Sequence, residues 1–173
     1  MVEAGGRRRA SPGARGVSSS PEAAHRAALD FLARPTHFES ELQRKLEHKG
    51  FAPDHVRAVL DRLRRAGLVD DRRAALELIA TKLRRSPQGA RRLRAELARR
   101  GVAAEVIDAA LAEALPADES GLAREAARRF KGRRRGADAR ALQRHLDRSG
   151  FSSRDILAVS EEPTDPEPPD DGG

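Results

Sequence analysis

The chain repeats one pattern of residues three times along its length. Residues 42–51 and 142–151 both have leucine at the first and fifth positions and end in glycine and phenylalanine. A looser copy, residues 93–102, lies between them. The glycines that close the copies are 51 and 49 residues apart and are Gly50, Gly101 and Gly150. An internal repeat of this length indicates that one supersecondary unit is used several times.

The alternative is three unrelated amphipathic helices that each happen to end in glycine. A true repeat is favoured because apolar residues stand at the same sequence distances from each glycine. Eight residues before the glycines the chain has Leu42, Leu93 and Leu142, and four residues before them it has Leu46, Leu97 and Leu146. Six residues after the glycines it has Val56, Ile107 and Ile156.

The segments between these positions have apolar residues at helical spacing, and proline and glycine residues separate one predicted helix from the next. Alanine, leucine and arginine, which dominate the composition, are good helix formers. We predict an all-α fold of three tandem three-helix repeats in an elongated, curved array, either right- or left-handed. The expected parts are a disordered basic arm at 1–19, repeats at 20–69, 70–116 and 117–160, and a disordered acidic tail at 161–173.

Local patterns give further expectations about helix ends and cores. Thr36 with Glu39 predicts a capping box for the second helix, and Asp70 or Asp71 predicts the cap of the fourth. We interpret the two adjacent aspartates as capping residues in preference to a metal site. The predicted core faces include Ala80 in the second repeat and, in the third, Leu122, Ala123, Ala126, Ala127 and Phe130.

Positive charge is concentrated in the second and third repeats. The chain has 30 arginines and 4 lysines; residues 72–115 carry ten basic and five acidic residues, and residues 116–160 carry eleven and six. Arginine binds phosphate through a bidentate fork, so this charge favours a surface for a polyanion over a merely solvated face. The candidate DNA- or filament-binding residues are Lys82, Arg84, Arg85, Arg91, Arg92, Arg94, Arg128, Arg129, Lys131, Arg133, Arg134, Arg135, Arg140 and Arg144.

Other classes of function find little support in the sequence. The chain lacks asparagine and has few glutamines for reading bases, and its five phenylalanines stand mostly at core spacing instead of forming stacking platforms. We therefore expect the chain to contact the backbone of single- and double-stranded DNA without sequence preference. No catalytic or metal spacing and no cofactor motif is present, so we expect no enzyme and no cofactor. Without a long apolar stretch or a secretory signal, we expect a cytoplasmic protein that does not enter a membrane.

Residues 67–75 read Gly-Leu-Val-Asp-Asp-Arg-Arg-Ala-Ala. This segment resembles the Gly-Leu-Leu-Asp-Asp-x-Arg-Phe-Ala signature of the RecX family, bacterial regulatory proteins of the RecA recombinase. Residues 88–97 resemble its Lys-Gly-Pro-x-x-Ile/Leu-x-x-Glu-Leu stretch, and residues 40–51 its Glu-Leu-x-x-Lys-Leu-x-x-Lys-Gly-Phe segment. The resemblance covers residues 22–160, and the order and spacing of the three segments make it specific. The chain departs from the pattern at Ala74, which replaces phenylalanine, at Ala90, which replaces proline, and at Phe38, which stands where a capping serine is common.

The resemblance implies three tandem three-helix repeats and a non-enzymatic modulator that inhibits RecA by binding the groove of the RecA–DNA filament. It implies a role in DNA repair, recombination and the SOS response, and we expect a monomer. The alternative is an independent DNA-binding protein, either without sequence preference or a transcription factor with helix-turn-helix-like units. A protein-binding scaffold whose arginines only confer solubility is a third possibility.

Overall fold

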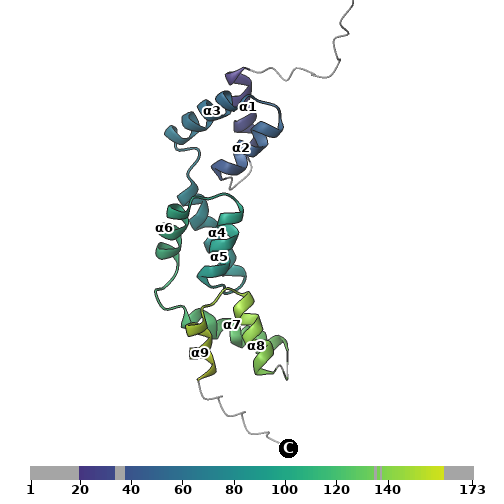
Figure 1. Ribbon diagram of the computed structural model, residues 1–173, viewed down its shortest axis with the longest axis vertical. Coiled ribbons are helices and arrows are strands. Elements are labelled where there is room, and N and C mark those ends of the chain that lie inside the picture. The colour runs from purple at the N-terminus through teal and green to yellow at the C-terminus, as the bar shows by residue number, and fades with distance from the viewer. Residues whose placement is uncertain (1–19, 34–37, 135, 137, 162–173) are drawn as a thin grey trace, which may run out of the picture.

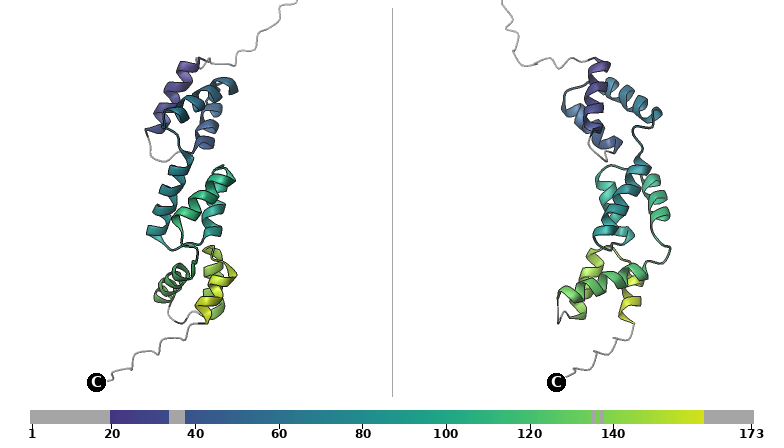
Figure 2. Two further views of the ribbon diagram at one scale, coloured as in Figure 1. Left: turned by 90° about the vertical axis from the view of Figure 1, so that its left-hand side faces the viewer. Right: turned by 180° about the vertical axis from the view of Figure 1, so that it is seen from behind.

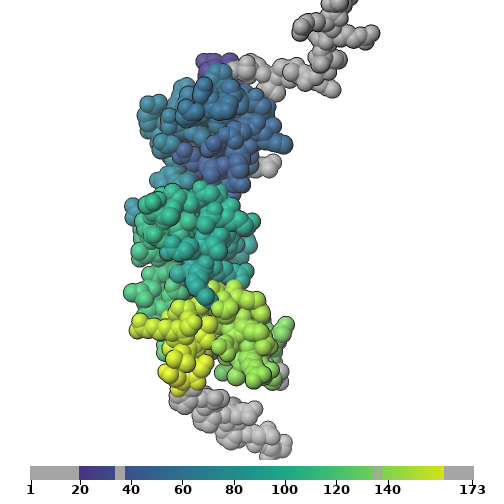
Figure 3. Space-filling model, viewed as in Figure 1, coloured from purple at the N-terminus to yellow at the C-terminus, as the bar shows by residue number. Residues whose placement is uncertain are grey.

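The structure, a computed structural model, describes residues 20–33, 38–134, 136 and 138–161, and this part of the chain is all α-helical. Its helices follow one another along an elongated molecule (Figures 1, 2 and 3). Their bounds are α1 Pro21–Leu32, α2 Glu39–His48, α3 Pro53–Arg65, α4 Asp71–Arg85, α5 Ala90–Arg99, α6 Ala104–Ala114, α7 Ser120–Arg133, α8 Ala139–Arg148 and α9 Ser153–Ser160. The prediction of three tandem three-helix units is confirmed.

Each unit builds its own core from three consecutive helices. The first helix of a unit packs against the third, as α1 with α3, α4 with α6 and α7 with α9. The leucines at repeat positions four residues before the glycines are buried in all three units, and they are Leu46, Leu97 and Leu146. The first and second cores each contain eleven buried apolar residues, whereas the third contains six. The third unit therefore gains the least from hydrophobic burial.

The three repeat glycines adopt the same backbone conformation. Gly50, Gly101 and Gly150 have φ of 87°, 84° and 89°, in the left-handed region that favours glycine. The residue after each glycine donates its backbone N–H to the carbonyl five residues earlier, at 3.2–3.3 Å. This is the bond of a Schellman motif, which ends a helix and satisfies a terminal carbonyl. The shared geometry confirms the alignment of the three copies.

The middle helices α2, α5 and α8 meet end to end, so the start of one lies on the glycine turn that closes the next. In the first junction, between α2 and α5, the Ser40 hydroxyl donates to the carbonyl of Arg100. The backbone N–H of Glu39 donates to Asp71 at 2.8 Å. Phe38, the N-cap of α2, is fully buried in the core of the second unit. Groups that helix ends leave unpaired are thus satisfied by the neighbouring unit.

The second junction, between α5 and α8, includes direct contacts between backbone atoms. Gly89 donates its N–H to the carbonyl of Ser149 at 2.9 Å, and Arg91 donates its N–H to the carbonyl of Gly150 at 3.3 Å. A Cβ atom added to Gly89 would lie 2.3 Å from the Gly150 carbonyl oxygen, so only glycine fits. Ala90 donates its N–H to Glu119 at 3.0 Å. A proline at position 90, as in the family pattern, would lack this donor.

The structure corrects several local predictions. Helix α2 begins at Glu39 after Phe38, so Glu39 is not the third residue that the predicted capping box needs, and Thr36 lies outside the described residues. Ala80 is exposed, because Ala75 and Ile79 form the inward face of α4. Phe130 lies outside the third core. Of the predicted terminal segments, residues 1–19 and 162–173 also lie outside the described part.

Candidate polyanion-binding surface

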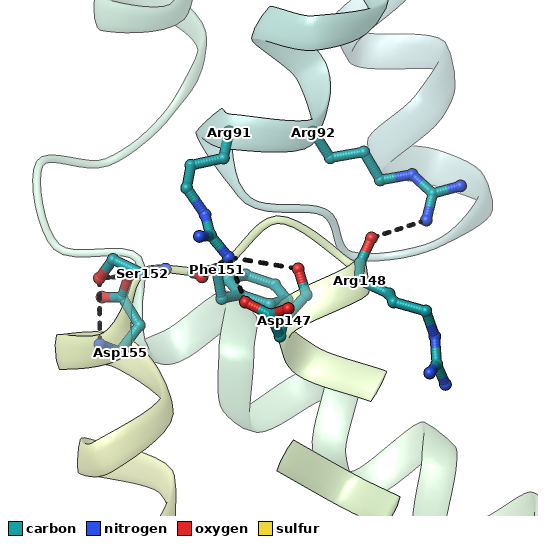
Figure 4. A network of polar contacts seen from close by, with 7 residues as sticks. All are labelled: Arg91, Arg92, Asp147, Arg148, Phe151, Ser152 and Asp155. Carbon is teal, nitrogen blue, oxygen red and sulfur yellow. Dashed lines mark hydrogen bonds and ion pairs between the residues drawn. The ribbon is translucent and has the colours of Figure 1, made fainter. Parts of the chain in front are cut away.

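Two of the candidate arginines hold the second junction together (Figure 4). Arg91 reaches from α5 to the end of α8, where its guanidinium contacts the Asp147 carboxylate at 2.7 Å and donates to the carbonyl of Phe151 at 2.8 Å. Arg92 donates to the carbonyl of Arg148 at 3.0 Å. Both guanidinium groups therefore neutralise the negative end of helix α8. Phosphate binding at these two positions would compete with contacts that join two units.

Other candidates on the list have partners within one unit. Lys82 pairs with Glu96 at 2.7 Å across α4 and α5, and both side chains are largely buried. Arg84 with Thr81 and Arg129 with Glu125 pair within one helix, and Arg94 on α5 pairs with Asp108 on α6. The pairs of Lys82 and Arg94 with acids reduce the positive charge that the second unit offers to a ligand.

The candidates without a side-chain partner among the described residues lie mainly on the third unit. All are exposed, and they are Arg85 at the end of α4, Arg128, Lys131 and Arg133 on α7, and Arg140 and Arg144 on α8. Arg135 lies outside the described residues. Helix α7 is close to the end of α4, because Arg129 donates to the carbonyl of Arg85 at 3.5 Å. The unpaired charge therefore gathers around α7 and α8.

Position in the array explains this distribution. Ser40, Arg91 and Arg140 each stand ten residues before a repeat glycine. Ser40 and Arg91 bind the end of the following unit. Arg140 occupies the same place in the last unit, where the described chain has no further unit to bind. An arginine that serves as a junction residue in the middle unit is thus left exposed in the third.

An aromatic pair that the sequence did not predict lies at the centre of this charge. The rings of Phe130 on α7 and His145 on α8 stack with centroids 4.5 Å apart and planes at 19°. The Arg134 guanidinium lies 5.8 Å from the centre of the Phe130 ring. Both rings are half-buried. Phe130 stands at core spacing in the sequence, so its periodicity hid this role.

Cations from three helices act on the imidazole of His145. Burial lowers the pKa of His145, and the positive charges of Arg148, Arg133, Arg134 and Arg92 lower the pKa further. These four arginines form, with Phe130 and His145, the junction cluster. Arg148 was absent from the candidates, although Arg140, Arg144 and Arg148 follow one face of α8 at intervals of four residues.

The Asp70–Asp71 pair caps two different helices. Asp70 accepts the N–H of Arg73 at 3.0 Å at the start of its own helix, whereas Asp71 accepts the N–H of Glu39 in the preceding unit. Burial raises the pKa of Asp71. The described residues contain no group of acidic, histidine or cysteine side chains placed to hold a metal ion. In the same part of the chain, none of the helices has the length and apolar character needed to cross a membrane.

Comparison with known proteins identifies similar sequences and structures. Residues 24–63 match the first three-helix domain of RecX, and residues 70–111 match the second three-helix domain of RecX. The regulatory protein RecX of Halorhodospira halophila is 37% identical over 147 residues, which cover 83% of this chain and 90% of that protein. The RecX of Pelodictyon phaeoclathratiforme is 37% identical over 86 residues, so the match spans about half of that relative, 54%. A crystal structure of regulatory protein RecX superimposes with a TM-score of 0.71 and 27% identity, covering 82% of this chain and 72% of the other.

Proposed function

Since the chain belongs to the RecX family of regulatory proteins, we propose that it modulates the RecA recombinase by binding the RecA–DNA filament. It inhibits strand exchange and ATP hydrolysis by RecA and catalyses no reaction itself. It acts in the cytoplasm as a monomer, in DNA repair and recombination.

The observation that carries this proposal is the set of exposed arginines on α7 and α8 that have no side-chain partner among the described residues. An elongated row of three units suits a helical polymer of protein and DNA, because it can follow the polymer over several subunits. The exposed guanidinium groups bind phosphates of the DNA backbone, whose charge dominates the affinity of such complexes and makes the affinity depend on salt. Few groups suited to reading base edges accompany the arginines, so this binding has no sequence preference.

The proposal assigns different tasks to the candidate arginines. Arg128, Lys131, Arg133, Arg140 and Arg144 bind phosphate, because each is exposed without a partner in the described part of the chain. Arg91 and Arg92 support the surface by fixing the third unit on the second. Charge reversal at these two positions would disturb the junction as well as any DNA contact, so they are poor probes of DNA binding.

The test combines a triple variant with a matched control. Arg128→Gln, Arg140→Gln and Arg144→Gln together should weaken binding to duplex DNA and reduce the slope of log affinity against log salt by about 2.7, since each phosphate contact contributes about 0.9. The same variant should inhibit RecA strand exchange and ATP hydrolysis less than the native protein at substoichiometric amounts. Circular dichroism should show an unchanged fold.

The control is Arg94→Gln, which removes an arginine that is paired with Asp108 and should leave the salt slope nearly unchanged. Inhibition of RecA that persists in full in the triple variant would refute the role of these arginines. Tight binding to one duplex sequence, without an effect on RecA, would instead favour an independent DNA-binding protein.

A further inference from the structure

We infer that Phe130 and His145 form a stacking platform for one unpaired base of single-stranded nucleic acid. The inference rests on the proposed function, because it adds a base contact to the phosphate contacts of the same surface. It assigns this chain a preference for single strands over duplexes, since the bases of a duplex are already stacked.

The first support is the place of Phe130 in the fold. Phe38, Phe51 and Phe151 are buried in the three cores, and Phe31 packs against the first core from its edge. Phe130 alone among the five phenylalanines belongs to no core, although it lies on a helix whose alanines line one. Its partly buried ring stacks on His145 instead of packing in a core, so hydrophobic packing of a unit does not explain its position.

The second support is the geometry of the ring pair. The two rings stack face to face with centroids 4.5 Å apart, so each ring covers one face of the other and a base would extend the stack on an outer face. Stacking on aromatic side chains is the usual means by which proteins hold single strands without sequence preference. The Arg134 guanidinium beside the Phe130 ring is a planar cation on an exposed side chain, so it can stack on the same base or move aside for it.

The third support is the charge around the pair. Arg133, Arg148 and Arg92 all act on His145, so a base on the platform would have its phosphates among cations from α7, α8 and α5. A neutral imidazole stacks without adding charge, and the lowered pKa of His145 favours this neutral form. The platform thus combines a neutral aromatic surface with a positive rim.

The test compares two oligonucleotides of equal length and charge, an oligothymidylate and an abasic strand that has the same phosphates without bases. Fluorescence anisotropy of labelled strands gives both affinities. The native protein should bind the oligothymidylate about fivefold more tightly or better, because stacking of one base on an aromatic side chain contributes on this scale. Phe130→Leu should bring the ratio of affinities close to one while leaving the affinity for the abasic strand unchanged.

Phe31→Leu is the matched control, because Phe31 is also half-buried beside cations, namely Lys45 and Lys49, yet packs on a core. It should leave the ratio at the native value. Phe130→Trp supplies a second readout, because the natural chain contains no tryptophan. The indole fluorescence of this variant should change when the oligothymidylate binds but not when the abasic strand binds.

Each outcome separates this inference from the proposed function. Equal affinity of the native protein for both strands overturns the platform but leaves the phosphate contacts intact. A native preference for bases that survives in Phe130→Leu also overturns it, because the base would then be bound elsewhere. Failure to bind either strand, or duplex DNA, removes the DNA contact on which both proposals depend.

Discussion

The two junctions of this array join equivalent helix ends by opposite means. At the first junction a large side chain, Phe38, enters the core of the next unit, and the Ser40 hydroxyl binds a helix-end carbonyl. At the second, Gly89 has no side chain, and the backbones of α5 and the α8 turn bind each other directly. The register of the repeat is the same at both. The repeat therefore specifies where units meet, whereas single residues at helix starts specify how closely the units approach.

The largest expected effect breaks the first junction. Phe38→Ala removes a fully buried ring from the second core and should lower the free energy of unfolding by about 3–5 kcal/mol. Urea denaturation measures the loss, and hydrogen exchange should place it in the second unit although the mutated residue precedes α2 of the first. Phe31→Ala, at a half-buried position, should cost clearly less. A loss below about 1 kcal/mol for Phe38→Ala would mean that the two units are joined by other contacts.

Gly89→Ala breaks the second junction. The backbone at Gly89 has φ −85° and ψ 163°, which any residue adopts, so the substitution tests only the clash with the Gly150 turn. We expect a loss of about 3 kcal/mol, because the atoms that the new methyl group meets are backbone and cannot rotate away. Small-angle scattering should show a changed position of the third unit. Gly121→Ala is the control: nothing lies within 4 Å of its Cβ, so the helix should become slightly more stable.

A smaller effect separates the backbone contribution from the side-chain contribution at the second junction. Arg91→Gln removes the contact with Asp147 and should cost about 1 kcal/mol, because both side chains are more than half exposed. A double-mutant cycle with Asp147→Asn measures the coupling. Arg140→Gln removes the arginine of the same register in the last unit and should leave the stability unchanged. Equal losses at the two positions would show that position in the array does not matter.

The smallest effect concerns the acid at the first junction. Burial raises the pKa of Asp71, so the folded state binds its proton more tightly than the unfolded state. The group therefore stabilises the fold at low pH, and this contribution is lost as the pH rises through the raised pKa. Asp71→Asn keeps an oxygen that accepts the Glu39 N–H and removes the charge, so stability at pH 7 should rise by a few tenths of a kcal/mol.

The pH series completes this test. The variant should lack the part of the pH dependence that Asp71 contributes, which urea denaturation at pH 4 and pH 7 measures as a difference between the two proteins. Glu119, whose pKa burial also raises, occupies the corresponding place at the second junction. Glu119→Gln should therefore change stability in the same direction. A decrease at pH 7 for both variants would show that the ionised carboxylates strengthen the junctions.

The sequence predicted the units because the signals for helix ends and inward faces are local. Glycine in a left-handed turn and leucine at helical spacing have the same role in every copy, so Gly101 and Leu97 were readable even in the loosest one. The contacts between units were not predictable in this way, because Phe38 and Gly89 occupy one register with opposite side chains. Nothing near Phe38 in the sequence indicates that its ring packs in the next core.

The candidate arginines show the same limit. Arg91 and Arg140 are alike in sequence context, but Arg91 meets the turn of a following unit, whereas the described residues place no unit beside Arg140. Arginine composition predicted a positive surface, which the structure concentrates on α7 and α8. Phe130 was assigned to the core because its spacing fits one, and only the packing of α7 on α8 shows that its ring lies elsewhere.

The middle helices α2, α5 and α8 are each ten residues long. In α5 the Gly89 start docks on the Gly150 turn and the Gly101 turn receives Ser40, so the length of this helix acts as a ruler of about 15 Å between the two junctions. One inserted residue would swing the next unit by about 100° around the helix axis and advance it by about 1.5 Å. Uniform length in these short helices therefore sets the pitch of the whole molecule, and with it the match to any periodic track along which the molecule lies.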